Sequence, residues 1–582
     1  MSDYPFESWK VIIILLLVLA GWCQSRPYPN RWVLVRKGLT SDKDVEFIRN
    51  IVKTGAAHGI NGMVFGANLD RIGLQPPEYL ARLEEVKRIC DEYQVEVIPK
   101  VFSVGYASAV MAHNRNLAAG IPVKDALFVV KNGKAILTAD PVVRVANGGF
   151  ENAKRNLPDS FRVSSGAGKV LIDHRNAGSG KNSLRFVALA STELIKDSQG
   201  RNHYKTLTTR ISQAIKVHPF RSYRLSCLVK TNDPNLLDTF KIYVSRPDTD
   251  EWSTRLGQVV VWDANVQGVG KWRKAVVGFN SLDCDRVKIH LGVATNSLNG
   301  KSGQFWIDDV RVEEVGFENI LRRPGTPFTV KNEKSGDIYR EGQDFVLANE
   351  PELDFDFKIE HRTPVLTLLP NSRIKNGDKL RVSYFYYKAM TKKGQVATCM
   401  SEPELYDIWQ REIRLVEKYL APKKYFLPLD EIRAGGTCQT CSERNLSMAQ
   451  ILGDCISKTI RIIRNVNTDA EIYAWSDMFD PNHNAHANYG LAGDFTNSWH
   501  YIPGDLIIVC WYYSKRKESL KFFSSLGFRT MAASYYDADN LDNTKGWLRA
   551  LDETKGALGI MYTTWQNKYE LLAAFGDLIM GN

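Results

Sequence analysis

The most constraining feature of this chain is a strand–helix alternation that stops after residue 105 and resumes near residue 396. Short runs rich in β-branched and aromatic residues predict eight strands, at 31–36, 60–65, 95–102, 424–429, 471–476, 506–511, 529–534 and 559–564. Apolar residues at helical spacing predict helices between them, at 42–57, 77–93, 402–420 and 447–464. Strands that alternate with helices in this way pair in parallel.

The two alternating stretches, residues 31–105 and 396–582, hold these eight strands in about 260 residues, the usual size of a (β/α)8 barrel. An open doubly wound sheet is the alternative, but the chain lacks the Gly-rich dinucleotide fingerprint of many such folds. We therefore predict an α/β fold, a (β/α)8 TIM barrel interrupted after its third strand.

The interrupting segment is predicted to be β-structured throughout. Residues 145–315 are rich in Gly, Ser and Asn and contain short alternating runs such as 223–229, 240–244 and 287–293. Short strands between turn residues are typical of a β-sandwich or jelly roll. Residues 316–390 continue as a small second β unit, with expected strands at 326–330, 362–369 and 379–387.

The N-terminus predicts export. Residues 11–22 form an uncharged apolar run that is shorter than the roughly 20 residues of a membrane span, so residues 1–25 are expected to be a cleaved signal peptide. The expected location is therefore secreted, periplasmic or in the cell envelope. An uncleaved anchor is the alternative, and it is the only membrane association that we expect.

The net charge of +11 does not predict a nucleic-acid partner. The longest basic run is Lys515-Arg516-Lys517, and a dispersed excess of Lys and Arg is typical of a solvated surface.

Nine cysteines in a chain of 582 residues do not indicate a disulfide scaffold. Cys438 and Cys441 form one CxxC motif without a second pair, whereas a tetrahedral zinc site needs four ligands. A local disulfide that includes Cys455 and a set of buried free thiols are the alternatives.

Carboxylates and aromatic residues gather where the predicted barrel strands end. Active sites of such barrels lie at the carboxyl ends of the strands. The residues expected there are Asp430 and Glu431 after strand four, Trp475 and Asp477 after strand five, Trp511 after strand six, Tyr535, Tyr536 and Asp537 after strand seven, and Trp565 after strand eight. Sugar rings stack on aromatic faces, and paired carboxylates serve oxocarbenium-like chemistry, so this pattern favours a glycan substrate.

Asp430-Glu431 is the sharpest element of the pattern. Successive residues of a strand point to opposite faces, so both carboxylates can serve one pocket only where the strand gives way to a loop. The run 433–437, Arg-Ala-Gly-Gly-Thr, supplies that break.

The order of these motifs resembles the catalytic domain of family 20 glycoside hydrolases, the β-N-acetylhexosaminidases. Residues 97–99 and 105–109 resemble the strand-three segment of that family, and Arg31 resembles its sugar-binding arginine. The resemblance implies hydrolysis of terminal N-acetylhexosamine by a substrate-assisted, retaining mechanism without a catalytic cofactor. Glu431 would be the general acid, and Asp430 would orient the 2-acetamido group of the substrate.

The same resemblance implies roles for the aromatic residues. Tyr535 or Tyr536 would hydrogen-bond the acetamido carbonyl, and Trp475 and Trp565 would wall the sugar, with Arg31, Asp477, Trp511 and Asp537 as further substrate contacts.

The interrupting segment resembles carbohydrate-binding modules of families 4 and 9. The resemblance rests on Asn147-Gly-Gly-Phe-Glu151 at its start and Trp306-Ile-Asp-Asp-Val310 at its end. It implies a structural calcium ion held by Glu151 and Asp308, because carboxylate oxygens are hard ligands that suit calcium.

Departures from the family pattern leave two other functions open. Tyr106 replaces the strand-three histidine of the family, and Lys100 and Ser103 replace its acidic residues. The alternatives are a glycosidase with Asp477 or Asp537 as its own nucleophile or base, and a non-catalytic glycan-binding surface protein.

Overall fold

The computed structural model describes residues 28–165, 168–188, 193–233, 237, 239–248, 255–258, 260–262, 270–294, 303–347, 357–389 and 395–581. The predicted signal peptide, residues 1–25, lies outside the described residues and stays a prediction. Among the described helices, none is long and apolar enough to cross a membrane.

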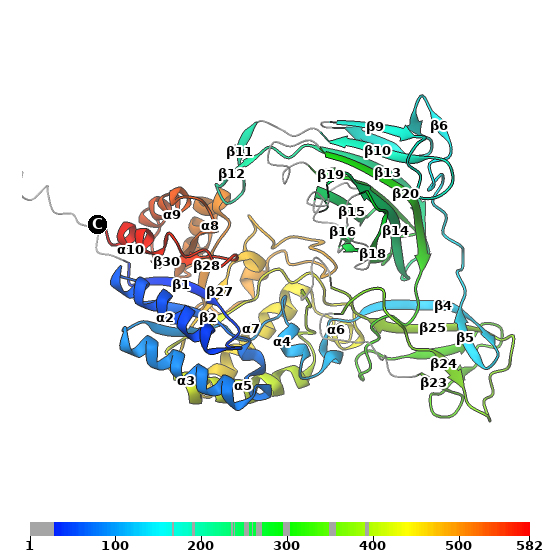
Figure 1. The fold of residues 1–582 in the computed structure, drawn as a ribbon. Helices are drawn as coiled ribbons and strands as arrows, with labels where there is room; N and C mark the ends of the chain where they lie inside the picture. Colours follow the sequence, from blue (N-terminus) through cyan, green and yellow to red (C-terminus); the bar gives the residue numbers. More distant parts are fainter. Residues whose placement is uncertain are drawn as a thin grey trace, which may run out of the picture.

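Eight parallel strands form one sheet, in the hydrogen-bonded order β26-β27-β28-β29-β30-β1-β2-β3 (Figure 1). A parallel bridge between Lys100 and Phe426 joins the two edges of this sheet, and Val101 N donates to Phe426 O at 3.0 Å, so the barrel is nearly closed. The TIM-barrel-like architecture is confirmed. The strands are β1 Asn30–Arg36, β2 Gly62–Gly66, β3 Glu96–Pro99, β26 Lys424–Leu427, β27 Glu471–Trp475, β28 Ile507–Cys510, β29 Thr530–Tyr535 and β30 Ala557–Thr563.

Alternate residues of the barrel strands face either the interior or the surrounding helices. In β1, Trp32 and Leu34 pack with an interior cluster, whereas Val33 and Val35 pack with the large outer core. Near-continuous apolar strands are typical of parallel sheets that are covered on both faces.

Amphipathic helices follow the strands and cover the barrel. Residues of α5 and α7 that face the sheet are buried, and Ser447 caps α7 because its hydroxyl accepts from Gln450 N at 3.2 Å. The helices are α2 Asp42–Ala57, α3 Pro77–Glu92, α4 Ser108–Met111, α5 Pro403–Leu420, α6 Gln439–Ser442, α7 Met448–Arg464, α8 Arg516–Ser525, α9 Asp542–Asp552 and α10 Leu572–Met580.

Two antiparallel sheets pack face to face in the segment between β3 and β26, where β10 contacts β19 and β15 contacts β18. Their orders are β17-β18-β14-β20-β10-β9 and β16-β15-β19-β13-β8. The strands are β8 Arg162–Ser165, β9 Gly168–Asp173, β10 Ser183–Ala188, β13 Thr208–Lys216, β14 Ser222–Thr231, β15 Phe240–Ser245, β16 Arg255–Gly257, β17 Val260–Trp262, β18 Arg273–Asn280, β19 Arg286–Ala294 and β20 Gly303–Glu314. A two-stranded ribbon, β6 Ala153–Lys154 and β7 Leu157–Pro158, precedes them.

A third antiparallel sheet has seven strands in the order β22-β21-β25-β4-β5-β24-β23. It contains β4 and β5, which precede the sandwich in sequence and which the sequence patterns did not predict. The strands are β4 Ile121–Lys131, β5 Lys134–Leu137, β21 Thr329–Asn332, β22 Ile338–Tyr339, β23 Phe345–Leu347, β24 Leu366–Leu368 and β25 Lys379–Tyr386. The small β unit therefore extends beyond residues 316–390, and its division from the sandwich as a domain stays a prediction.

A hairpin, β11 Leu194–Lys196 and β12 Asn202–Tyr204, reaches from the sandwich to the barrel (Figure 1). Its turn contacts the loops after β28 and β29: Ser514 N donates to Ser198 O at 2.9 Å, and Arg201 Nη1 donates to Tyr536 O at 3.0 Å. The sandwich thereby contacts the rim on which the barrel strands end.

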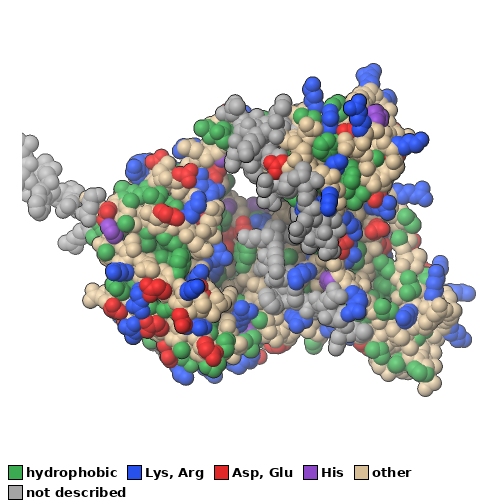
Figure 2. All heavy atoms as spheres, in the orientation of Figure 1, with side chains coloured by type: hydrophobic (Ala, Val, Ile, Leu, Met, Phe, Trp, Pro, Cys, Tyr) green, Lys and Arg blue, Asp and Glu red, His purple; other side chains and the backbone are tan. Residues whose placement is uncertain are grey.

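Figure 2 shows Lys and Arg side chains scattered over the visible face, with Asp and Glu among them. On that face the positive charge does not gather in one patch, and this agrees with the dispersed charge of the sequence.

Candidate active site

A cavity of about 730 Å³ opens at the carboxyl ends of the barrel strands. Parallel barrels build their active sites at this rim. The predicted site residues that line the cavity are Asp430, Glu431, Trp475, Trp511, Tyr536 and Trp565. Arg36, Asp70, Lys100 and Tyr106 also line it.

Asp430, after β26, lies near Lys100, which directly follows the neighbouring strand β3. Burial raises the pKa of Asp430, the Lys100 cation opposes that rise, and the charge of Glu431 adds to it. Burial lowers the pKa of Lys100, while Asp430 counteracts this effect. Each group thus favours the charged form of the other, although burial outweighs this effect in both pKa shifts.

The carboxylate of Glu431 accepts three hydrogen bonds. Its Oε1 accepts from Arg433 Nη2 at 3.0 Å, and its Oε2 accepts from the Tyr106 hydroxyl and from Gln395 Nε2 at 3.3 Å. Burial and the charges of Glu431 and Asp430 raise the pKa of Tyr106, which keeps its proton for donation. The Glu431 side chain is 25% exposed, so it is positioned firmly and is still accessible to a ligand.

Asp477 lies behind the pair and is fully buried. Its Oδ2 accepts from Glu431 N and from Asn484 Nδ2, both at 2.9 Å, and its Oδ1 accepts from Trp511 Nε1 at 3.3 Å. Burial, followed by the charge of Asp430, raises the pKa of Asp477 to about 8. Asp477 does not line the cavity; it holds the Glu431 backbone and the Trp511 indole in place.

Aromatic rings form much of the cavity wall. Trp511 and Tyr536 are nearly parallel, with ring centroids 5.9 Å apart, and Trp565 lies 6.2 Å from Tyr536 and 6.2 Å from Trp475. The Arg36 guanidinium lies over the Trp565 ring at 5.0 Å, which is a cation–π geometry. Such walls suit the apolar faces of sugar rings.

Tyr535 and Tyr536, which the sequence could not rank, have different surroundings. Tyr535, Tyr536 and Asp537 have φ values of +78°, +54° and +59°, a left-handed turn that separates the two rings. The ring of Tyr535 stacks on Tyr562 at 4.1 Å, while Tyr536 lines the cavity. Burial and the charges of Asp430 and Asp477 raise the pKa of Tyr536 well above its usual value, so it is a neutral hydroxyl donor.

Asp537 holds the loop that follows β30. Its carboxylate accepts from the Thr564 hydroxyl, from Trp565 N at 3.0 Å and from Gln566 N at 3.2 Å. It lies outside the lining of the main cavity, so its contribution is to position Trp565.

Arg31 lies at the opposite end of the barrel, and the predicted contact with a sugar in the cavity is incompatible with this position. It is the second residue of β1, and its guanidinium donates to Gly59 O and to Tyr28 O, both at 2.6 Å. The arginine that β1 contributes to the cavity is Arg36, its last residue. Chain direction alone would have identified Arg36, because only the carboxyl ends of parallel strands meet at this rim.

Lys100, Tyr106 and Asp70 are further cavity residues that the sequence did not mark as site residues. Lys100 and Tyr106 depart from the family pattern, and Lys100 directly follows β3, where a cavity residue is expected. Asp70 is buried, and its carboxylate accepts from Phe102 N at 2.5 Å and Ser103 N at 3.0 Å, so it supports the loop after β3. No sequence signal marks Asp70, because it lies in a 3-10 turn after β2.

Glu151 and Asp308, the predicted calcium ligands, both contact the loop over residues 178–182. Glu151 Oε1 accepts from Lys181 N at 2.8 Å and Asn182 N at 3.2 Å, and Asp308 Oδ2 accepts from Gly178 N and Ser179 N at 2.8 Å each. Backbone N–H groups thus occupy oxygens that a calcium ion would use, and the calcium site stays a prediction.

When this chain is compared with known proteins, only solved structures match it. The sequence matches no protein-family model and no curated protein. A rhamnosidase from Novosphingobium sp. PP1Y has 10% identity and a TM-score of 0.32, over 97% of this chain and 60% of the rhamnosidase. A chitobiase from Flavobacterium johnsoniae has 7% identity and a TM-score of 0.36, over 95% of this chain and 48% of the chitobiase.

A carbohydrate-binding module in complex with β-1,4-galactotriose has 17% identity and a TM-score of 0.21, over 30% of this chain and all of the module. These three neighbours are two glycoside hydrolases and one carbohydrate-binding module, and a Stig cyclase is also similar, with 12% identity and a TM-score of 0.21 over 31% of this chain.

Proposed function

We propose that this chain is a glycoside hydrolase that acts in the cavity at the carboxyl ends of the barrel strands. The observation that carries the proposal is the adjacent pair Asp430 and Glu431 in an aromatic-walled cavity of about 730 Å³. Glycoside hydrolysis needs a proton donor for the leaving oxygen and a negative group near the oxocarbenium-like centre.

Within this proposal the substrate is a terminal N-acetylhexosaminide and the reaction is substrate-assisted. Glu431 donates a proton to the leaving oxygen, and the acetamido carbonyl of the substrate attacks the anomeric carbon. Asp430 accepts from the acetamido N–H and stabilises the positive charge that forms there. Tyr536 donates its hydroxyl to the acetamido oxygen, and Trp475 and Trp565 stack against the ring.

The positions of Asp477 and Asp537 support this route over an enzyme nucleophile. Neither carboxylate lines the cavity, whereas those of Asp430 and Glu431 do. A nucleophile must contact the anomeric carbon, so a substrate nucleophile suits this cavity better than either aspartate.

Lys100 favours a second candidate, a non-catalytic glycan-binding protein. Its cation lies close enough to Asp430 to oppose the rise in the pKa of that carboxyl group. If Lys100 neutralises the charge that would stabilise the transition state, the cavity binds sugars without turning them over.

Turnover of aryl glycosides separates the two candidates. The panel includes N-acetylglucosaminides, N-acetylgalactosaminides and sugars without an acetamido group, each with good and poor leaving groups. We expect turnover of an N-acetylhexosaminide, and inhibition by a thiazoline analogue of the cyclised intermediate. Binding of sugars without turnover of any member would favour the second candidate.

Substitution of the two carboxylates tests the assigned roles. We expect Asp430→Asn to lower kcat by roughly 10²-fold, about 2.7 kcal/mol, because it removes the stabilising charge. Glu431→Gln should slow substrates with poor leaving groups far more than activated ones, since good leaving groups need little protonation. Asp469→Asn and Glu78→Gln, at exposed positions away from the cavity, are the matched controls. Unchanged kcat in Asp430→Asn would contradict the substrate-assisted route.

A further inference from the structure

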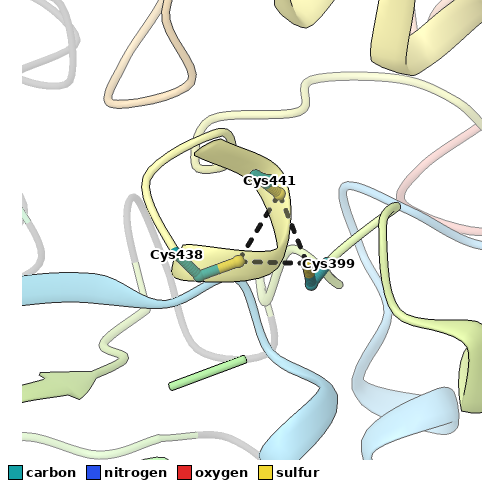
Figure 3. A group of neighbouring side chains, drawn as sticks. All are labelled: Cys399, Cys438 and Cys441. Carbon is teal, nitrogen blue, oxygen red and sulfur yellow. Dashed lines mark hydrogen bonds between the residues drawn. The ribbon is translucent and has the colours of Figure 1, made fainter. Parts of the chain in front are cut away.

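Three buried cysteines from two distant parts of the sequence come together beside the loop that carries the carboxylate pair. The Sγ atoms of Cys399 and Cys438 are 3.4 Å apart, those of Cys399 and Cys441 are 3.5 Å apart, and those of Cys438 and Cys441 are 3.5 Å apart. Figure 3 shows the three sulfur atoms pointing toward one another, Cys438 and Cys441 from the chain at α6 and Cys399 from a separate segment. We propose that these three thiols bind one zinc ion.

The sulfur triangle fits a metal better than a disulfide. A disulfide bond is about 2.05 Å long and joins only two of the three sulfur atoms, so one distance would be much shorter than the others. The three observed distances are almost equal. Three thiolates about 2.3 Å from a tetrahedral zinc ion lie about 3.8 Å apart, so contact with zinc requires each sulfur to move outward only slightly. Three soft sulfur donors select zinc over magnesium or calcium.

An oxygen completes the site. Among the described residues, this is the only group of three or more His, Cys, Asp or Glu side chains whose ligand atoms lie close enough for a metal ion, and it contains no fourth member. Ser401 Oγ lies 3.3 Å from Cys441 Sγ and also accepts from Arg444 Nη1 at 3.2 Å. The fourth ligand is therefore the Ser401 oxygen or a water molecule held by it.

A buried cation balances the charge of the site. Zinc with three thiolates carries one net negative charge. Arg323 is 6% exposed, and its charge interacts with Cys399, Cys438 and Glu402. Its Nε donates to Glu402 Oε1 at 2.7 Å, so the guanidinium is held in place next to the sulfur atoms.

The ion would link two segments that hold the carboxylate pair. Cys438 and Cys441 follow Glu431 and Arg433 on the loop after β26, and Cys399 lies shortly before α5, where the chain returns to the barrel. The Cys399 segment also carries Gln395, whose Nε2 donates to Glu431 Oε2 at 3.3 Å. The ion would therefore fix the loop with Glu431 against the returning chain, whatever reaction the cavity performs.

Metal analysis of the purified full chain tests this site directly. Protein produced with added zinc and purified without chelator should contain one zinc per chain by mass spectrometry of the metal. Cys399→Ser, Cys438→Ser and Cys441→Ser should each lower the content below roughly 0.2 per chain. Cys455→Ser, a buried cysteine on the adjacent α7 outside the triangle, should retain it.

Cobalt binding gives a second measurement, which uses only the wild-type protein and so does not depend on whether a variant folds. Wild-type protein stripped with a chelator and titrated with Co²⁺ should develop a thiolate-to-cobalt charge-transfer band that saturates at one equivalent. The proposal would be overturned if wild-type protein contained no zinc as purified and also developed no such band with Co²⁺. A peptide map of unreduced protein that links two of the three cysteines would also overturn it, because a disulfide is the competing state in an oxidising compartment.

Discussion

At the scale of single residues, the cavity depends on how closely backbone segments approach each other. Glu431 leaves the extended conformation with a φ of +50°, so that it and Asp430 both line one cavity. Gly105, in the loop after β3, lies against the backbone of this pair. A Cβ atom at Gly105 would lie 2.1 Å from Asp430 O and 3.0 Å from Glu431 O.

We therefore expect Gly105→Ala to displace the carboxylate pair. The clash is with backbone atoms that cannot rotate away, so the loop after β3 or the Asp430-Glu431 segment must shift. Stability should fall by about 1–3 kcal/mol, and activity on the best aryl glycoside should fall at least tenfold. Gly504→Ala is the control, because a Cβ atom there meets nothing within 4 Å. Equal urea midpoints and equal kcat for both variants would show that the close approach is unimportant.

At the scale of elements, the hairpin β11–β12 completes the rim beside the loop after β29. Arg201 Nη1 donates to Tyr536 O at 3.0 Å, and Asn543, which accepts from Tyr535 N at 2.9 Å, donates to Gln199 O at 2.5 Å. A second cavity of about 400 Å³ lies between this hairpin and residues 537–543. The hairpin thus supports the left-handed turn that directs Tyr536 into the main cavity.

Removing the Arg201 side chain should loosen this turn without unfolding the barrel. We expect Arg201→Ala to raise KM about three- to tenfold, since a hydrogen bond from a charged group contributes about 1 kcal/mol or more. The melting temperature should change by less than about 2 °C. Lys205→Ala, which removes the ion pair with Glu193 at 2.8 Å, is the matched control and should leave KM unchanged. An unaltered KM in Arg201→Ala would mean that the hairpin does not position Tyr536.

At the scale of the whole molecule, a buried ion pair of the sandwich lies at its junction with the seven-stranded sheet. Arg221 Nε lies 3.1 Å from Glu314 Oε1, and the two side chains are 1% and 2% exposed. Arg221 Nη2 also donates to Asp125 O in β4 at 2.7 Å. Burial raises the pKa of Glu314 to about 7, and the Arg221 charge and a backbone hydrogen bond from Asp140 oppose the rise.

Breaking this pair should destabilise the junction more strongly as the pH rises. The folded state holds a proton on Glu314 up to about pH 7, whereas the unfolded state loses it near pH 4.5, so the free energy of unfolding falls between these values. Arg221→Met removes the cation and should cost about 3–5 kcal/mol above pH 7, because it leaves a buried carboxylate unpaired.

The double variant Arg221→Met/Glu314→Gln should recover most of that loss and show a smaller pH dependence. Urea denaturation at pH 5, 6, 7 and 8 measures both effects. A single variant whose deficit does not change across this range would contradict the assigned ionisation of Glu314.

The sequence by itself determined the barrel and the positions of most cavity residues. All eight barrel strands lie within a few residues of their predicted ranges, because apolar runs between amphipathic helices are a local signal. The direction of parallel strands then places Asp430, Glu431, Trp475, Trp511 and Trp565 at one rim. The sandwich strands at 223–229, 240–244 and 287–293 were predictable for the same reason.

Only the tertiary structure decided which of these groups meet. Strand pairing across more than two hundred residues brings β4 beside β25. The spacing of apolar residues within a strand does not indicate which distant strand it pairs with. The left-handed turn separates Tyr535 from Tyr536, closure of the barrel brings Lys100 to Asp430, and the return of the chain brings Cys399 to Cys438 and Cys441. These contacts depend on long-range packing and on backbone angles that local sequence patterns do not determine. They could therefore not be predicted from the sequence.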